Sequence, residues 1–261
     1  MRRPAAAVLC AALLAGCAGA AGERPGTVDG RAQDPPRVVS APRHLPPVVD
    51  HVPTRDPVVF LTYDDGAERD PGFVALVRAR RLPVSMFLTD SVVGPGYGHF
   101  ARLRAVGASI QNHTLDHPAL RGLPYAGQRA EICGQQHKLR SRFGISPRLF
   151  RPPYGTYDRA TLRAAADCGI TAVVLWRASL NADGELTYTR GEPGLRAGDI
   201  VSVPSGETGS LTLTERTERL LREIGERGLR VGRLEDHLED RLEDRPEDRP
   251  EKTPGRRAAG N

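Results

Sequence analysis

From residue 58 onward, short apolar runs alternate with longer segments in which apolar and polar residues recur at helical spacing. The apolar runs predict strands over residues 58–61, 84–88, 148–151, 170–176, 200–203 and 229–231. The segments between them predict helices over residues 72–81, 100–106, 123–143, 158–168 and 213–227. Strands that alternate with helices are typical of a parallel sheet or barrel, so we expect an α/β fold.

The two ends of the chain lack this alternation, and they set the expected domain boundaries. Residues 17–56 are rich in Pro, Gly, Ala and Arg and predict an extended tether. Leu-Glu-Asp repeats at a period of four begin at Leu234 and continue into residues 235–261, which then become rich in proline. We expect this segment to be a solvated, largely disordered tail, with a binding tail as the alternative. The folded domain is then expected over residues 57–234.

Residues 1–16 predict a secretory signal, because two arginines precede an apolar run too short to span a membrane. The run ends in Leu-Ala-Gly before Cys17, and this pattern resembles the bacterial lipobox. In such signals cleavage precedes the cysteine, which then carries lipid. We therefore expect an extracytoplasmic protein held at the membrane by lipid on Cys17. The alternative is an ordinary signal cut after Ala18 or Ala20, which would release a secreted protein.

Cys133 and Cys168 are the two cysteines of the expected folded domain. In an oxidising compartment they can form a disulfide, whereas the alternative is two buried free thiols on separate helices. The sequence leaves both possibilities open. Neither cysteine lies in a C-x-x-C motif, which argues against a metal site built from thiolates.

The charge of the chain is mildly basic. The formal net charge is +5, and removal of Arg2 and Arg3 with the signal lowers it by two, to +3. The sequence contains no basic cluster with interleaved aromatic residues, so we expect no binding to nucleic acid. We expect the protein to be a monomer.

Two polar motifs carry the candidate chemistry. Residues 62–66 read T-Y-D-D-G and place Asp64 and Asp65 at the end of the first predicted strand. His113 and His117 form an H-x-x-x-H pair, and on one helical turn their imidazoles would share a face and hold one ion. Two imidazoles and one carboxylate suit a divalent metal, with positions left open for water and substrate. Taken alone, the first motif can simply be a turn, and the second is often a pair of surface residues.

These motifs, in this order, resemble those of the polysaccharide deacetylase family, carbohydrate esterase family 4, over residues 58–234. Residues 62–66 resemble its first motif, residues 107–117 its second, and R-P-P-Y-G at 151–155 its third. The resemblance implies an irregular (β/α) barrel. It also implies a metal-dependent enzyme, usually with zinc, that removes acetyl groups from N-acetylated polysaccharides such as peptidoglycan or chitin.

The resemblance also implies a role for each residue of the motifs. Asp65, His113 and His117 would bind the metal, and Asp64 would be the general base that activates a water molecule. Arg151 would keep Asp64 ionised and oriented, because a neighbouring cation favours the carboxylate. The backbone N–H of Tyr154 would bind the oxyanion that forms during the reaction.

The later motifs depart from the family pattern. The family's general-acid histidine is expected where this chain has Pro204, which has no titratable group, and the segment after Trp176 lacks the acidic residue expected to tune that histidine. Glu207 is the nearest substitute. Loss of a general acid costs about 10²–10⁴-fold in rate.

Two functions therefore stay open. One is a hydrolase acting on N-acetyl or O-acetyl groups. The other is a catalytically impaired lipoprotein that binds glycan without turnover. Ester cleavage would tolerate the loss better than amide cleavage, because an alkoxide leaves with less help than an amine.

Overall fold

The computed structural model describes residues 44–204 and 211–243. The expected signal, Cys17, most of the expected tether, Glu207 and the end of the tail lie outside the described residues. Among the described residues, no helix is both long and apolar enough to cross a membrane.

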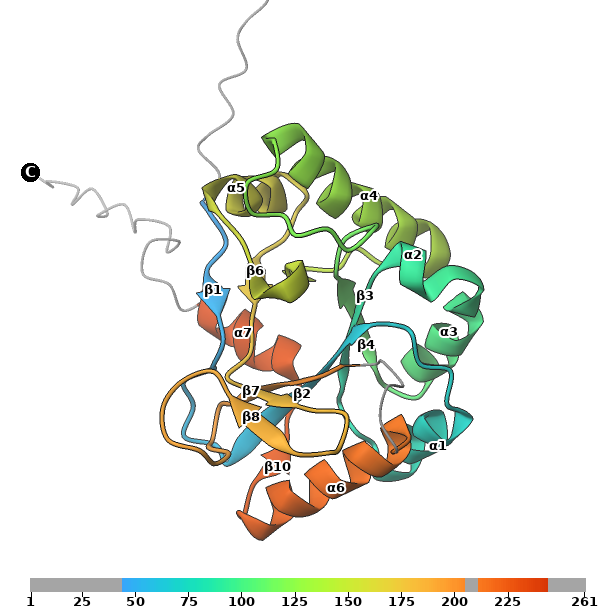
Figure 1. Ribbon diagram of the computed structural model, residues 1–261, viewed down its shortest axis with the longest axis vertical. Helices are drawn as coiled ribbons and strands as arrows, with labels where there is room; N and C mark the ends of the chain where they lie inside the picture. The colour runs from blue at the N-terminus through green and yellow to red at the C-terminus, as the bar shows by residue number, and fades with distance from the viewer. Residues whose placement is uncertain (1–43, 205–210, 244–261) are drawn as a thin grey trace, which may run out of the picture. The chain divides into compact units, whose positions relative to one another are not determined.

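A curled sheet forms the centre of the domain, with helices packed around it (Figure 1). Its strands are β1 (Val48–Val49), β2 (Val58–Asp65), β3 (Ser85–Leu88), β4 (Ser109–Asn112), β5 (Leu149–Phe150), β6 (Ala172–Val174), β7 (Ala178–Leu180), β8 (Leu186–Tyr188), β9 (Ile200–Val203) and β10 (Arg230–Val231). Their spatial order is β1-β6-β5-β4-β3-β2-β9-β7-β8, and β10 pairs with β2. Every described strand pair is parallel except β7 with β8. The expected irregular (β/α) barrel is thereby confirmed as a curled, open sheet.

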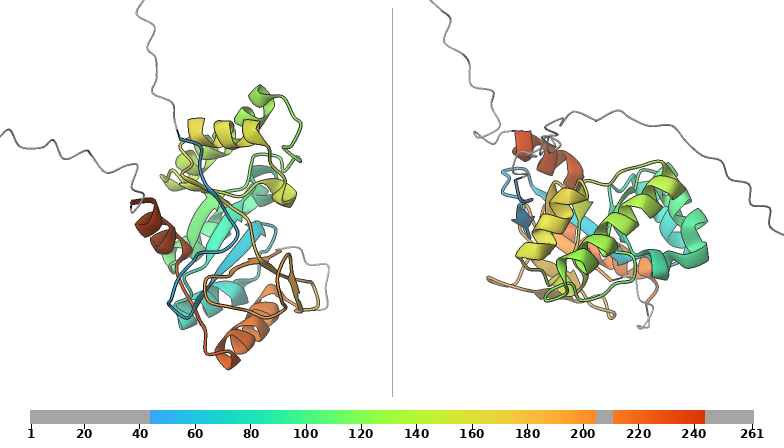
Figure 2. Two further views of the ribbon diagram at one scale, coloured as in Figure 1. Left: turned by 90° about the vertical axis from the view of Figure 1, so that its left-hand side faces the viewer. Right: turned by 90° about the horizontal axis from the view of Figure 1, so that it is seen from above.

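The helices connect the strands, and all but α7 cover the outside of the sheet. They are α1 (Pro71–Arg80), α2 (Asp90–Val93), α3 (Tyr97–Ala105), α4 (Tyr125–Phe143), α5 (Arg159–Asp167), α6 (Leu213–Glu226) and α7 (Leu234–Glu243), with short 3₁₀ turns at Gly94–Gly96 and Pro153–Gly155. The helix α1 packs against α3 and α6, and α4 packs against α5 (Figures 1 and 2). The sequence predicted five of these helices to within a few residues and missed α2 and α7.

Strand β2 runs through the middle of the sheet and is buried on both faces. Val59, Leu61 and Tyr63 pack outward in one apolar cluster with side chains of α1, α3 and α6. Val58 and Phe60 point to the inside of the curl and join a second cluster. This alternation follows from the two-residue period of a strand. It also places the side chain of Asp64 on the inside of the curl.

The expected tether ends earlier than residue 56, because residues 44–56 already belong to the fold. Strand β1 adds to the edge of the sheet, where Val48 pairs with Val173. Val52 is buried in the inner cluster. The expectation was wrong here because prolines flank an edge strand without breaking its ladder, and three apolar residues suffice to dock it.

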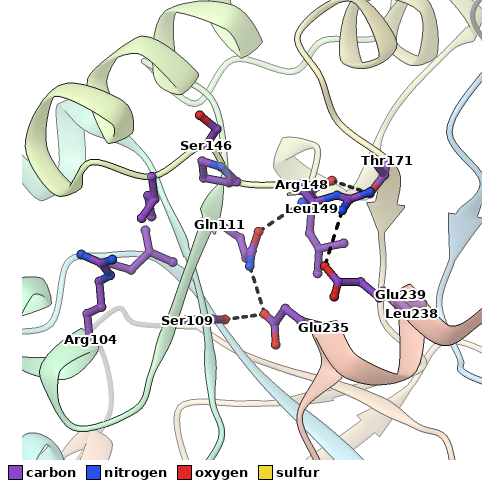
Figure 3. Close-up of a pocket in the computed structure, with 13 residues that line it drawn as sticks. Arg104, Ser109, Gln111, Ser146, Arg148, Leu149, Thr171, Glu235, Leu238 and Glu239 are labelled. Atoms are coloured by element: carbon purple, nitrogen blue, oxygen red, sulfur yellow. Dashed lines mark hydrogen bonds and ion pairs between the residues drawn. The ribbon is translucent and has the colours of Figure 1, made fainter. Parts of the chain in front are cut away.

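The expected tail was also wrong at its start, because residues 234–243 form helix α7. Leu234 and Leu238 lie one helical turn apart and are both buried inside the curl. Oε1 of Glu235 accepts hydrogen bonds from Gln111 Nε2 at 3.0 Å and from Ser109 Oγ (Figure 3). It also accepts one from Ser85 Oγ at 2.8 Å. These strand residues lie at or near the amino ends of β3 and β4. Helix α7 therefore closes the end of the curl opposite to the strand carboxyl ends.

Replacing Glu235 by alanine is expected to lower the free energy of unfolding by about 1–3 kcal/mol, because buried hydroxyl and amide donors lose their acceptor. Urea unfolding measures the change. Glu239→Ala is the matched control on the same helix, since Glu239 is exposed and its contact with Arg148 is 3.8 Å long. That change should cost less than about 1 kcal/mol. Equal losses in both variants would contradict the assigned role of Glu235.

The structure joins Cys133 of α4 to Cys168, which follows α5, in a disulfide. Of the two possibilities that the sequence left open, the disulfide is the one present. The bond ties together two helices that already pack side by side over the outside of the sheet (Figure 2). It encloses a loop with a sequence separation of 35 residues.

The double variant Cys133→Ala/Cys168→Ala is expected to be less stable than the wild type by about 2–4 kcal/mol, because the unfolded chain regains the freedom that the cross-link removes. Urea unfolding with and without a reductant tests this. Reductant should bring the wild type to the stability of the variant and leave the variant unchanged. An unchanged wild type, once its thiols are shown to be free, would refute the prediction.

Candidate active site

The candidate site lies where the carboxyl ends of neighbouring strands meet. In the sheet register Asp65 pairs with Leu88, Leu88 with Asn112, and Asn112 with Phe150. The next residues continue the backbone ladder, since His113 N–H donates to the Leu88 carbonyl and Arg151 N–H to the Asn112 carbonyl. Strands β2, β4 and β5 therefore deliver Asp64, Asp65, His113 and Arg151 to one edge of the sheet, as expected for a barrel of this kind.

Asp64 and Asp65 reach the same site only because the backbone turns at Asp65, the last residue of β2. Successive residues of a strand point to opposite faces, so two adjacent carboxylates would normally separate. Asp65 has φ of 65° and Gly66 has φ of 86°, both in the left-handed region. A Cβ at Gly66 would lie 2.8 Å from Val93 and 2.9 Å from Leu88, so only glycine fits this turn. The turn brings the carboxylate of Asp65 beside the histidines.

Three ligand atoms converge at this turn. Oδ1 of Asp65 lies 3.4 Å from Nε2 of His113 and 3.1 Å from Nε2 of His117, and the two Nε2 atoms are 3.2 Å apart. Ligands that bind one zinc ion at about 2 Å lie about 3 Å or slightly more from one another. Oδ1 of Asp65 is also buried without a hydrogen bond of standard geometry. Asp65, His113 and His117 therefore fit a divalent metal ion.

The tautomer of His113 supports the same arrangement. Its Nδ1 lies 2.7 Å from the carbonyl oxygen of Arg151, which only accepts hydrogen bonds. The ring proton therefore sits on Nδ1, and the lone pair of Nε2 faces Asp65 and His117. A backbone carbonyl behind a ligating histidine commonly fixes the ring in this way.

The carboxyl group of Asp65 is ionised, as a metal ligand requires. Burial raises the pKa of its carboxyl, but the neighbouring imidazoles of His113 and His117 outweigh burial and hold that pKa below its ordinary value. A carboxylate binds a metal in its deprotonated form.

The two histidines do not lie on a helical turn, which corrects the expectation from their spacing. Residues 113–117 form a loop in which Thr114 has φ of 75° and His117 has φ of 60°. Glu131 of α4 accepts from the backbone N–H groups of Leu115 and Asp116 at 3.1 and 3.0 Å. These contacts, rather than helical periodicity, turn the second imidazole back toward the first.

Asp64 is paired with a fully buried arginine. Nη1 of Arg151 donates to Oδ1 of Asp64 at 2.6 Å, and its other nitrogens donate to the carbonyls of Val174 and Leu175. The guanidinium carbon also lies 4.4 Å from the centre of the Phe87 ring. Burial lowers the pKa of Arg151 and the charge of Asp64 opposes this effect. The arrangement fits the expected pairing of a general base with an orienting cation.

Tyr154 lies beside the metal ligands. Its ring centre is 4.8 Å from that of His117, with the rings edge to face, and the side chain is 65% exposed. Tyr154 lies between Pro153 and Gly155 in the turn of the R-P-P-Y-G motif, and its φ is 59°. Its expected role in binding an oxyanion stays a prediction.

The segment in which a general acid was expected carries no imidazole. Pro204 directly follows β9, and its carbonyl oxygen accepts from Nη1 of the buried Arg216 at 3.1 Å. In the segment after Trp176, Arg177 binds both carboxylate oxygens of Asp199 at 2.5 Å. Asp199 precedes β9, at the end remote from Pro204, so this ion pair lies away from the site.

Sequence reasoning missed Ser202, whose hydroxyl donates to Oδ2 of Asp64 at 2.7 Å. No spacing rule marks this serine, because its contact depends on how β9 pairs with β2.

Comparison with known proteins identifies the family. Residues 51–173 match the family model for polysaccharide deacetylase. An uncharacterised protein of Streptomyces coelicolor is 69% identical over 206 residues, which cover 79% of this chain and 83% of that protein. The chain belongs to the polysaccharide deacetylase family.

Other members of the polysaccharide deacetylase family are more distant. Chitin deacetylase 1 of Cryptococcus neoformans is 27% identical over 161 residues, which cover 61% of this chain and 34% of the fungal protein. The chain therefore spans about a third of that enzyme's length. A solved structure of a pseudoenzyme of carbohydrate esterase family 4 from Bacillus anthracis superposes with a TM-score of 0.63 at 19% identity, over 74% of this chain and 69% of that one. This likeness supports the fold, and the chemistry of this polysaccharide deacetylase domain has to follow from its own residues.

Proposed function

We propose that the protein is a metal-dependent hydrolase that removes acetyl groups from a cell-wall or surface polysaccharide. The observation that carries the proposal is the convergence of Asp65, His113 and His117 within 4.8 Å, next to the buried pair of Asp64 and Arg151. Zinc is the proposed metal, because two imidazoles and one carboxylate form one of the donor sets of catalytic zinc sites.

Each residue of the proposed site has a separate role. Asp65, His113 and His117 would hold the ion, which supplies Lewis acidity and lowers the pKa of a water molecule to about 7. Asp64 takes a proton from the attacking water, since its carboxylate keeps unused lone pairs on both oxygens. Arg151 holds the carboxylate in place through Oδ1. The turn at Tyr154 borders the site and offers a backbone N–H to the oxyanion.

N-acetyl and O-acetyl substrates differ in how much the leaving group needs a proton donor. Pro204 supplies no proton, so an amine leaving group gains no help from that position. An alkoxide needs less help, and the site therefore favours an O-acetyl over an N-acetyl substrate. The lack of a proton donor at Pro204 also favours the alternative function, in which the protein binds an N-acetylated glycan such as peptidoglycan or chitin without turnover.

Acetate release with and without metal tests the proposal. The zinc-loaded protein is incubated with O-acetylated xylan and with N-acetylglucosamine oligomers, then treated with a chelator and reloaded. We expect release that disappears on chelation and returns with zinc, with the higher rate on the O-acetyl substrate. His113→Ala should fail to regain activity on reloading. Release that persists in the metal-free protein would refute the metal-dependent mechanism, and binding without release would favour the alternative function.

We also propose that the protein is extracytoplasmic and anchored by lipid on Cys17. The lipobox-like sequence and the disulfide between Cys133 and Cys168 support this, because disulfides persist in oxidising compartments. Labelling cells with a fatty acid tests the proposal. Label should appear on the wild type and be absent from Cys17→Ala, which should leave the membrane fraction, and label on both proteins would contradict the anchor site.

A further inference from the structure

Ser202 lies on the strand next to the one that carries the proposed base. Strand β9 pairs in parallel with β2, and the register places Ser202 opposite Thr62. The serine is 3% exposed, and its hydroxyl donates to Oδ2 of Asp64 at 2.7 Å.

The face of β9 that carries Ser202 is the one turned to the site. Alternate residues of a strand share a face, so Ile200 and Ser202 point inward while Val201 and Val203 point outward. The apolar clusters agree, since Ile200 belongs to the inner one and Val201 and Val203 to the outer one. Pro204 carries no titratable group, but Ser202, two residues earlier on the chain, presents a buried hydroxyl on the inner face of this strand.

Two donors from opposite sides fix the plane of the Asp64 carboxylate. Arg151 binds Oδ1 at 2.6 Å from β5, and Ser202 binds Oδ2 at 2.7 Å from β9. The terminal torsion of an aspartate is otherwise broad, so one donor alone leaves the carboxylate free to rotate. With one donor on each oxygen, a lone pair on each oxygen stays available to a water molecule.

We propose that Ser202 is a positioning residue, which holds Oδ2 of Asp64 in the orientation needed to take a proton from the attacking water. This inference rests on the proposed function, because it assigns Ser202 to the same site. The serine acts through Asp64 and touches neither metal ligand nor substrate in this role.

Thr62 offers a matched control. It lies opposite Ser202 in the register, is fully buried and carries a hydroxyl, but that hydroxyl donates to the carbonyl of Val201 at 2.8 Å. Thr62→Val removes a buried hydroxyl from the same pair of strands without touching the carboxylate. A merely structural role for Ser202 predicts similar effects of Ser202→Ala and Thr62→Val.

Kinetics of the zinc-loaded variants on an acetylated substrate test the proposal. We expect Ser202→Ala to lower kcat by about 10–100-fold, as for a misplaced catalytic group, with KM changed by less than about twofold. Ser202→Thr should restore kcat to within about threefold of the wild type, and Thr62→Val should stay within that range. Wild-type kcat in Ser202→Ala, or an equal loss in Thr62→Val, would overturn the proposal.

Crystal structures of the wild type and Ser202→Ala separate this proposal from the proposed function. We expect one carboxylate orientation of Asp64 in the wild type and a rotated or second orientation in the variant. If the wild type releases no acetate from any substrate, the proposed function fails, while the structures still decide on Ser202. An unchanged Asp64 in Ser202→Ala would then overturn the positioning role. Should Ser202→Ala not fold, Ser202→Cys provides the same comparison, because a thiol is only a weak donor, and Ser202→Thr remains the variant that keeps the hydroxyl.

Discussion

Replacing Asp64 by asparagine is expected to lower acetate release by about 10²–10⁴-fold, because an amide cannot take the proton of the attacking water. The substitution keeps the size of the side chain. Its amide oxygen can still accept from Arg151, and its NH₂ group can donate to Ser202, whose hydroxyl also accepts hydrogen bonds. The fold and the metal site should therefore survive the loss of activity, at a lower stability because the buried guanidinium of Arg151 loses its counter-charge.

Metal content and kinetics together measure this effect. Asp64→Asn should bind zinc with the stoichiometry of the wild type, whereas His113→Ala should lose it. Asp116→Asn is the matched control, because Asp116 is an exposed carboxylate in the histidine loop and should keep activity within about twofold of the wild type. If Asp64→Asn retained more than a tenth of the activity, Asp64 would not be the general base.

The position of the site could be predicted from the sequence because parallel strands end at a common edge. Asp64 follows the strand predicted at residues 58–61, Arg151 ends the strand predicted at residues 148–151, and the structure joins the two side chains at 2.6 Å. The way in which the ligands converge could not be predicted. It depends on left-handed backbone at Asp65 and His117 and on contacts from Glu131, which is distant in sequence.

The ends of the domain were harder to predict because few residues dock them. The repeat that contains helix α7 is strongly charged, and Leu234, Glu235 and Leu238 are among the few residues that bind it to the sheet. Glu235 accepts hydrogen bonds from Ser85 and Gln111, and no local sequence pattern links either residue to position 235. Ser202 illustrates the same limit, since its contact with Asp64 follows from the register of two strands that lie far apart in the sequence.

Arg151→Met is expected to lower the free energy of unfolding by about 3–5 kcal/mol, because it leaves the Asp64 carboxylate without its partner in a nearly dry site. Side-chain exposure in this pair is 0% for Arg151 and 12% for Asp64. Methionine fills much of the same volume beside Phe87, so lost packing contributes little. Acetate release should fall as well, since the base loses the donor on Oδ1.

An exposed ion pair of the same domain provides the control for this prediction. Arg190 binds both oxygens of Asp50 at 2.6 and 2.7 Å, but its side chain is 58% exposed. Arg190→Ala should cost less than about 1 kcal/mol, because water replaces the lost partner. The double variant Asp64→Asn/Arg151→Met should recover part of the stability lost in Arg151→Met, since it leaves no unpaired carboxylate. If Arg151→Met proved no more costly than Arg190→Ala in urea unfolding, the buried pair would not hold the site together.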